Sequence, residues 1–192
     1  MPPSKTDSRP FSASMSWMLD NPIAKTHARR IMRHLHIAPG MRVLDVGCGS
    51  GRLAVPIAEV VGDGGEVVGL DIQERMIEKL ERRARNHGLS NIKSVHAPAG
   101  EGKLPEGPYD LALLVAVLGE IPADRRRPAV DEIARSLKPG GILAVAEGPP
   151  DPHRQNKETV IGLGSATGLE PLRETRVWGG FVLQLRKPPS KT

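Results

Sequence analysis

Hydrophobic and polar residues follow each other along this chain in blocks that switch between the period of a strand and the period of a helix. Short apolar runs predict strands over 41–46, 66–70, 91–96, 109–117 and 142–147. Between them, apolar residues at helical spacing predict helices over 52–61, 73–87 and 123–137. One helix is predicted before this series, over 22–36, and one after it, over 155–167, followed by strands over 170–177 and 181–186.

The order of these blocks favours an α/β fold. Strands and helices that alternate at short spacing are typical of a parallel sheet with helices on both faces. The run 109–117 is apolar almost throughout, as expected of a strand that is buried on both faces. The link Trp178-Gly179-Gly180 indicates a hairpin between the last two strands. We therefore expect a parallel sheet with helices on both faces, into which the closing hairpin puts one antiparallel strand.

Apolar stripes on the predicted helices give the expected core. The predicted inward residues are Leu53, Ile57, Val60 and Val61 on the second helix, Met76, Ile77, Leu80 and Ala84 on the third, and Val130, Ile133, Ala134 and Leu137 on the fourth. Turns are expected at 62–65 and at 138–141, where glycines gather. Residues 1–14 are rich in Pro, Ser and Lys, which predicts a disordered tail before a single domain over 15–188.

Composition narrows the class of protein. Hydrophobic residues make up 39% of the chain and charged residues 26%, while aromatic residues make up only 3%, so we expect a soluble globular protein with an aliphatic core. No apolar run is long enough to span a bilayer, and the polar start of the chain lacks the apolar stretch of a signal peptide. Cys48 is the one cysteine and cannot form an internal disulfide. We therefore expect a cytoplasmic protein without a membrane partner.

The net charge of +5 raises the question of an anionic partner. Basic residues gather in two places, over 25–36 and in the run Arg125-Arg126-Arg127. The simpler interpretation is that they lie on solvated helix faces. Nucleic acid is the alternative, and the scarcity of aromatic residues argues against a mode of binding in which bases stack on side chains.

The segment Val43–Gly51, with the sequence VLDVGCGSG, is a strand that runs into a glycine loop and then into a helix. Ligands of such sheets bind at the carboxyl ends of the strands. A dinucleotide site would need a third glycine where Arg52 stands, and a Walker loop would need Gly-Lys-Ser/Thr. Asp45 would repel a phosphate but could hold an ammonium group. The loop therefore favours a ligand with a positively charged amino acid end.

A second acid follows the next strand, in Gly69–Ile72. The carboxylate of Asp71 can accept both hydroxyls of a ribose, and Ile72 could pack on a purine. The structural alternative for Asp71 is to cap the helix that follows it. Together with the glycine loop upstream, the ribose role is favoured.

These motifs resemble those of the class I S-adenosylmethionine-dependent methyltransferases. The resemblance covers residues 40–148 and also rests on the apolar strand after Tyr109-Asp110 and on the segment Leu137–Gly141. It implies a Rossmann-like, doubly wound, seven-stranded sheet in which the last strand is antiparallel, which agrees with the hairpin. It also implies methyl transfer from S-adenosyl-L-methionine to a small-molecule acceptor, with S-adenosyl-L-homocysteine as the product. The residues that it places at the cofactor are Asp45, Gly47, Cys48, Gly49, Ser50, Gly51, Asp71, Ile72 and Val115.

The resemblance leaves the adenine contact open. Many members of the family carry an acid after the third strand, at the place where this chain has Gly100, with Glu101 beside it. Either Glu101 takes that role or only backbone contacts the adenine. Trp17 and Met18 lie in a segment similar to one that precedes a helix covering the cofactor, which implies an N-terminal helical lid over 15–38.

Two glutamates are the candidate catalytic residues. Glu120 follows the fourth strand and Glu147 ends the fifth, so either could bind a cationic acceptor or act as a base. We expect no metal. The alternatives are a nucleic-acid methyltransferase, although no Asn/Asp-Pro-Pro-Tyr/Phe motif follows the fourth strand, a cofactor-binding subunit without catalysis, and a dehydrogenase.

Overall fold

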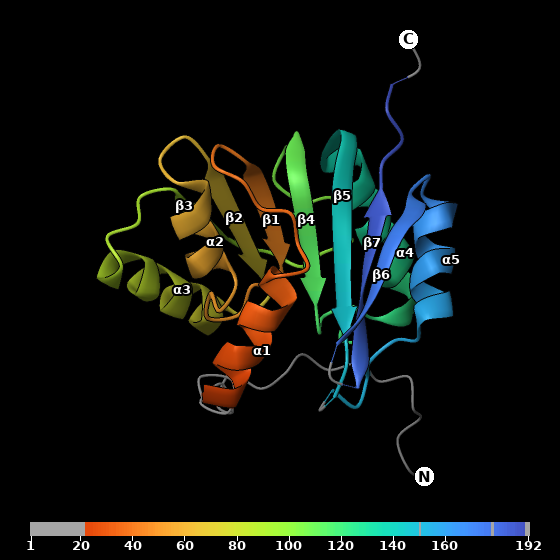
Figure 1. Cartoon of the computed structure of the whole chain (residues 1–192), viewed down its shortest axis with the longest axis horizontal. Coiled ribbons are helices and arrows are strands. Elements are labelled where there is room, and N and C mark those ends of the chain that lie inside the picture. Colours follow the sequence, from red (N-terminus) through yellow and green to blue (C-terminus); the bar gives the residue numbers. More distant parts are fainter. Residues whose placement is uncertain (1–21, 150, 178, 191–192) are drawn as a thin grey trace.

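The computed structural model describes residues 22–149, 151–177 and 179–190. This part of the chain forms one seven-stranded sheet with helices packed against it (Figure 1). The strands are β1 (Arg42–Val46), β2 (Glu66–Asp71), β3 (Ile92–His96), β4 (Tyr109–Val115), β5 (Leu137–Glu147), β6 (Glu170–Val177) and β7 (Gly180–Arg186). The helices are α1 (Pro22–Met32), α2 (Ala54–Val61), α3 (Glu74–Asn86), α4 (Ala123–Ser136) and α5 (Lys157–Ala166).

The strand order is β3-β2-β1-β4-β5-β7-β6. Strands β3, β2, β1, β4 and β5 pair in parallel, and β7 runs antiparallel between β5 and β6. The predicted doubly wound sheet with an antiparallel last strand is therefore confirmed. The chain winds outward from β1 to β3 and then returns to place β4 on the other side of β1. The carboxyl ends of β1 and β4 thus form the topological switch point, where open α/β sheets bind their ligands.

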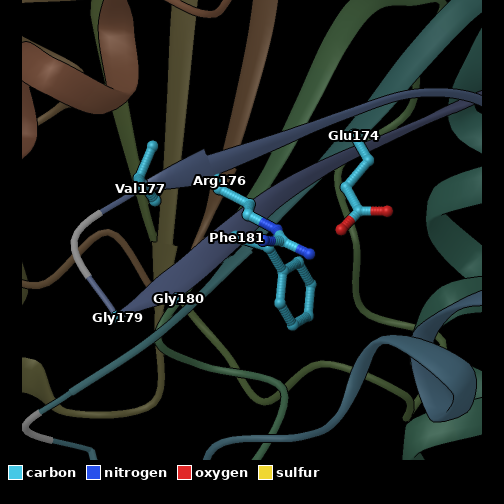
Figure 2. Close-up of a pocket in the computed structure, with 6 residues that line it drawn as sticks. All are labelled: Glu174, Arg176, Val177, Gly179, Gly180 and Phe181. Atoms are coloured by element: carbon cyan, nitrogen blue, oxygen red, sulfur yellow. The ribbon is translucent and has the colours of Figure 1, made fainter.

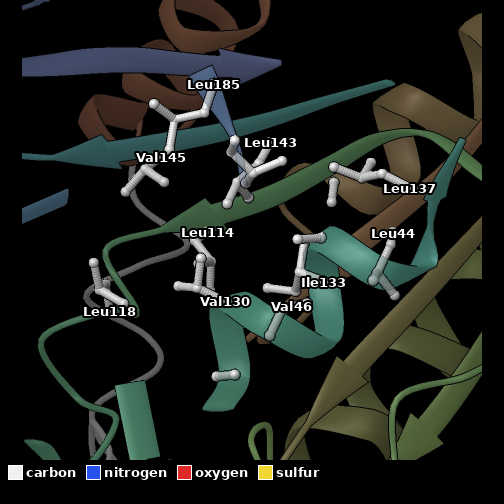
Figure 3. Packing of buried hydrophobic residues seen from close by; sticks show 14 of the residues in the cluster. Leu44, Val46, Leu114, Leu118, Val130, Ile133, Leu137, Leu143, Val145 and Leu185 are labelled. Carbon is white, nitrogen blue, oxygen red and sulfur yellow. The ribbon is translucent and has the colours of Figure 1, made fainter. Parts of the chain in front are cut away.

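The core lies in two layers, one on each face of the sheet. Leu44 and Val46 of β1 point to the face covered by α4, where they join Val130 and Ile133 (Figure 3). Val43, which directly precedes Leu44, points to the other face, which α1, α2 and α3 cover. Because successive side chains of a strand point to opposite faces, a strand with apolar residues at nearly every position fits only between two such layers.

The glycine-rich segment 138–141 is not the free turn that was predicted. It belongs to β5, which begins at Leu137. The N–H of Gly140 donates to the carbonyl of Lys187, and the N–H of Lys187 donates to the carbonyl of Gly141, each over 2.9 Å. The residue after β7 thus supplies hydrogen-bond partners that the local sequence could not reveal.

Two helical predictions also need correction. Helix α1 ends at Met32 rather than at residue 36. On α2, Ile57 and Val61 are buried as predicted, but Val60 is 43% exposed. Ile57 and Val61 are four residues apart and therefore lie on nearly the same side of the helix, which faces the core. Val60 lies outside this buried side.

No helix among the described residues is both long and apolar enough to cross a membrane. The predicted disordered tail over 1–14 lies outside the described residues, as does the part of the predicted lid that precedes α1.

Candidate cofactor site

The glycine loop between β1 and α2 is packed tightly on one side and open on the other. A Cβ atom on Gly47 would lie 2.3 Å from Cγ2 of Val117, so only glycine fits against the loop that follows β4. A Cβ atom on Gly49 would meet nothing within 4 Å. The N–H groups of Gly47 and Cys48 both donate to the carbonyl of Leu70, over 2.7 and 3.0 Å. The loop is therefore fixed to β2 and β4 and leaves bare backbone exposed at Gly49.

Asp45 lies beneath this loop as a buried carboxyl group. Only 2% of the residue is exposed, and its Oδ2 atom has no hydrogen-bond partner among the described residues. Burial raises the pKa of Asp45 to about 7, and the charge of Asp71 adds to the effect. The charge of Arg52 and the backbone N–H of Ala54 act in the opposite direction. A buried acceptor oxygen without a donor indicates a place for a ligand group that donates, above all a cationic one.

Asp71 ends β2 and contacts the glycine loop directly. Its Oδ2 atom accepts a hydrogen bond from the N–H of Gly49, and its Oδ1 atom accepts one from the N–H of Gln73, each over 2.9 Å. The residue is 7% exposed, and burial raises its pKa. The N-cap residue of α3 is Gln73, so Asp71 does not occupy the capping position itself. A carboxylate has lone pairs for about four donors, which leaves room for two ligand hydroxyls.

The other predicted cofactor residues surround these two acids. Cys48 and Ser50 are buried within the loop, and burial raises the pKa of the Cys48 thiol, which keeps it protonated. Ile72 is 52% exposed, an unusual state for a large apolar side chain, and lies next to Asp71. Val115 is half-buried at the end of β4. Trp17 and Met18 lie outside the described residues.

Many members of the family carry an acid after the third strand to contact the adenine. At this position, which is Gly100 here, the chain packs against α4. The N–H of Gly100 donates to Oε2 of Glu132 over 3.1 Å, and a Cβ atom on Gly100 would lie 2.8 Å from the carbonyl of Arg125. Glu101 is exposed and pairs with Lys103 over 3.6 Å. The tight approach of α4 explains why a glycine, rather than an acid, stands at position 100.

A second group of acids lies at the ends of β4 and β5. Glu147 is 3% exposed, its Oε2 atom accepts the N–H of Gln155 over 3.1 Å, and its Oε1 atom has no partner in the part of the chain that the structure describes. The pKa of Glu147 is raised to about 7, mainly by burial and also by the charges of Asp151 and Glu120. The hydrogen bond from Gln155 and the charge of Arg126 act in the opposite direction. The two predicted catalytic glutamates are thus close enough to influence each other.

Arg126 joins the loops that carry these acids. Its Nε and Nη2 atoms donate to the carbonyls of Ile121 and Gly119, over 3.0 and 3.1 Å, and Nη1 donates to Oε1 of Gln155 over 3.0 Å. The interpretation of the basic run as a solvated helix face is therefore wrong for its middle residue. Asp151, whose Oδ1 atom accepts a backbone N–H over 2.7 Å, was not predicted, because nothing in its local sequence sets it apart from an ordinary loop acid.

A pocket of about 400 Å³ opens at the hairpin between β6 and β7 (Figure 2). It is lined by Glu174, Arg176, Val177, Gly179, Gly180 and Phe181. Phe181 pairs with Glu147 across the ladder between β7 and β5, so the pocket adjoins the second group of acids.

Within the described residues, no three side chains of the metal-binding types come together.

Comparison with known proteins identifies the family. The profile of the family described as "Methyltransferase domain" matches residues 43–141, from β1 to the early part of β5. The chain therefore belongs to the methyltransferase-domain family. It is similar to demethylmenaquinone methyltransferase of Geobacillus kaustophilus (strain HTA426), with 34% identity over 117 residues, which are 61% of this chain and 49% of the relative.

A second relative is nocamycin O-methyltransferase of Saccharothrix syringae, 34% identical over 128 residues, which are 65% of this chain and 44% of the relative. The chain thus spans about half the length of these curated relatives. Among solved structures, a SAM-dependent methyltransferase from Aquifex aeolicus has a TM-score of 0.82 at 23% identity, covering 93% of this chain and all of the other. N-methyltransferase NodS from Bradyrhizobium japonicum WM9, in complex with S-adenosyl-L-homocysteine, has a TM-score of 0.72 at 19% identity and covers 90% of this chain and 91% of that one. Both likenesses extend the shared fold beyond the matched region.

Proposed function

We propose that this chain binds S-adenosyl-L-methionine at the glycine loop after β1 and transfers the methyl group to a small-molecule acceptor, with S-adenosyl-L-homocysteine as the product. One observation carries the proposal: the buried Oδ2 atom of Asp45 has no donor among the described residues and lies beneath the loop. An amino acid end with an ammonium group would supply that donor, directly or through water.

The rest of the site fits the same cofactor. The open side of Gly49 allows a ligand to lie against backbone, and Asp71 beside it retains lone pairs for two ribose hydroxyls. Ile72 offers an exposed apolar surface to a purine. A dinucleotide fits poorly, because Asp45 at the glycine loop would repel a diphosphate. The contacts of Gly100, Glu101, Trp17 and Met18 with the cofactor remain part of this proposal.

When bound, the cofactor supplies a sulfonium methyl group that is already activated for in-line displacement. The protein then has to align the acceptor with that methyl group and exclude water. The carboxyl ends of β4 and β5 hold Glu120 and Glu147 next to the switch point, where an acceptor would lie. Glu147, with a pKa of about 7, is suited to take a proton from the acceptor near neutral pH.

The acceptor is proposed to be a small molecule because the relatives' names refer to demethylmenaquinone and to nocamycin. Nucleic acid is disfavoured, because the middle arginine of the basic run is half-buried and hydrogen-bonds to loop carbonyls. A cytoplasmic location remains a prediction.

Calorimetry with purified protein tests the cofactor assignment. We expect S-adenosylhomocysteine to bind more tightly than NAD, and Asp45→Asn to weaken this binding, since Asn removes the charge that attracts the ammonium group. An Asp63→Asn variant, changed at an exposed turn, serves as the control and should bind as the wild type does. Tighter binding of NAD, or no binding of S-adenosylhomocysteine, would overturn the proposal.

A further inference from the structure

Two carboxyl groups, one at the end of β5 and one in the loop after it, each have one oxygen that lacks a hydrogen-bond donor. The Oε1 atom of Glu147 and the Oδ2 atom of Asp151 are both buried, and neither has a partner within the described ranges. Glu147 is 3% exposed, so bulk water does not supply the missing donor. A buried acceptor without a donor is costly, which means that both oxygens fit a ligand that brings its own N–H or O–H groups.

The charges around these oxygens favour a positively charged ligand. Three acids, Glu120, Glu147 and Asp151, are close enough for the charges of the other two to raise the pKa of Glu147. Arg126 is the cation that opposes them, yet its Nε, Nη1 and Nη2 atoms donate to two backbone carbonyls and to the side chain of Gln155. Glu147 and Asp151 each also present a buried acceptor oxygen without a partner among the described residues, so these two carboxylates offer negative charge to a ligand.

This group lies one loop away from the proposed methyl donor. Val117 packs so closely on Gly47 of the glycine loop that a Cβ atom there would lie 2.3 Å from its Cγ2 atom. The N–H of Glu120 in turn donates to the carbonyl of Val117 over 2.9 Å. The same short loop thus contacts the cofactor loop at one end and carries an acid of the group at the other.

We propose that the methyl acceptor is an amine, bound as an ammonium ion between Glu147 and Asp151, and that Glu147 takes the proton that frees the nitrogen lone pair. The inference rests on the proposed function, whose acceptor class it specifies. An ammonium ion offers three N–H donors to a site with two unpartnered oxygens, and its charge is opposite to that of the two carboxylates.

The reaction balances without a further reactant. An N–H bond of the ammonium ion breaks, and its proton goes to a carboxylate oxygen of Glu147. The nitrogen lone pair then forms the new N–C bond to the methyl carbon, and the C–S bond breaks with its electron pair staying on sulfur. The products are a protonated methylamine, neutral thioether and the protonated carboxyl of Glu147, which returns its proton to solvent.

The pocket at the β6–β7 hairpin has room for the rest of the acceptor. Glu147 and Phe181 are directly paired on neighbouring strands, so their side chains lie on the same face of the sheet, about 5 Å apart at the backbone. Figure 2 shows the ring of Phe181 at the pocket of about 400 Å³, a size typical of small-molecule sites. An amine held at Glu147 can therefore extend an apolar or aromatic body over this ring.

Benzylamine and its neutral analogue benzyl alcohol test the proposal by calorimetry on the full chain, with and without saturating S-adenosylhomocysteine. At a pH above the value of about 7 for the pKa of Glu147, we expect benzylamine to bind about tenfold more tightly than benzyl alcohol, because hydrogen bonds to charged groups are stronger. Glu147→Gln and Asp151→Asn should each reduce this preference. Glu158→Gln, at an exposed acid of α5, should keep it.

Phe181→Leu separates the two parts of the site, because it should weaken both ligands alike and leave the preference for the amine unchanged. Thermal unfolding checks that each variant is folded. Equal binding of the amine and the alcohol by the wild type, or an unchanged preference in both folded acid variants, would overturn the amine inference. Failure of S-adenosylhomocysteine to bind would instead overturn the proposed function. The two outcomes can be distinguished, because binding of the amine and the alcohol is also measured without S-adenosylhomocysteine.

Discussion

The backbone N–H of Gly49 donates a hydrogen bond to Oδ2 of Asp71 over 2.9 Å, and this contact joins the glycine loop after β1 to the end of β2. The other oxygen of Asp71 accepts the N–H of Gln73, just before α3. One carboxylate therefore fixes two chain segments that are far apart in sequence and still has lone pairs for a ligand. The proposed ribose contact and the shape of the loop depend on the same side chain.

Replacement of this carboxylate should weaken cofactor binding. We expect Asp71→Ala to reduce the binding free energy of S-adenosylhomocysteine by about 1–3 kcal/mol, the cost of removing a buried acceptor with a charge. Calorimetry measures the change, and Asp71→Asn should fall between the wild type and the alanine variant. Unchanged affinity in a folded Asp71→Ala protein would contradict the ribose assignment.

The close contact between Gly47 and Val117 should be visible in stability. Gly47→Ala inserts a methyl group where Cγ2 of Val117 already lies 2.3 Å from the ideal Cβ position, and we expect it to lower the free energy of unfolding by about 1–3 kcal/mol. Val117→Ala should recover part of that loss, so the two changes should not be additive in a double-mutant cycle. Denaturant unfolding measures the free energy of unfolding of each single variant and of the double variant. Strictly additive changes would show that the contact between Gly47 and Val117 does not cause the loss of stability.

Cofactor affinity should depend on pH through Asp45. Its pKa in the folded protein is raised from 3.8 to about 7, so between these values the empty folded state binds a proton that the unfolded chain releases, and Asp45 lowers folding stability as pH rises through this window. A bound ammonium group favours the charged form, so binding releases the proton.

The affinity for S-adenosylhomocysteine should therefore rise about tenfold per pH unit below this pKa and level off above it. Calorimetry across this pH range measures how steeply the affinity changes with pH. Asp45→Asn should abolish the part of this pH dependence that comes from the carboxyl group of Asp45. A slope that stays the same in Asp45→Asn would assign the proton to another residue.

Arg126 should contribute more to folding stability than its neighbours in the basic run Arg125-Arg126-Arg127. Arg126→Ala leaves the carbonyls of Gly119 and Ile121 without their donor, and we expect a loss of about 1–3 kcal/mol in the free energy of unfolding. Arg127→Ala is the matched control, because Arg127 is exposed, and it should change stability by less than about 0.5 kcal/mol. Equal effects of the two variants would mean that the hydrogen bonds of Arg126 do not hold the loops.

Much of the fold could be predicted from local sequence because its determinants are local. The local sequence predicts the strands from their apolar runs, the loop from its glycines and the hairpin from its link. The alternation of predicted strands and helices then implies the parallel sheet. The acids Asp45 and Asp71 could be singled out because each lies near the carboxyl end of a strand, and the two strands end at the same edge of the sheet. By contrast, segment 138–141 joins β5 through hydrogen bonds with Lys187, a residue almost fifty positions later, and local sequence carries no sign of that pairing.

The second group of acids could be predicted only in part. Glu120 and Glu147 were expected at the ends of their strands, but Asp151 and Arg126 were not expected to join them. Their meeting depends on how two loops pack, and Arg126 is held there by backbone carbonyls, which every residue possesses. A sequence pattern of residue types therefore could not have revealed it.

Transfer of a radiolabelled methyl group from S-adenosyl-L-methionine to a small molecule is the activity proposed for this chain, and it can be measured. Purified chain is incubated with the labelled cofactor and a cell extract separated into small-molecule and nucleic-acid fractions, with the Asp45→Asn variant as the matched control. We expect label in the small-molecule fraction with the wild type and a strong reduction with Asp45→Asn. Label in nucleic acid, or no transfer by a chain that binds S-adenosylhomocysteine, would contradict it.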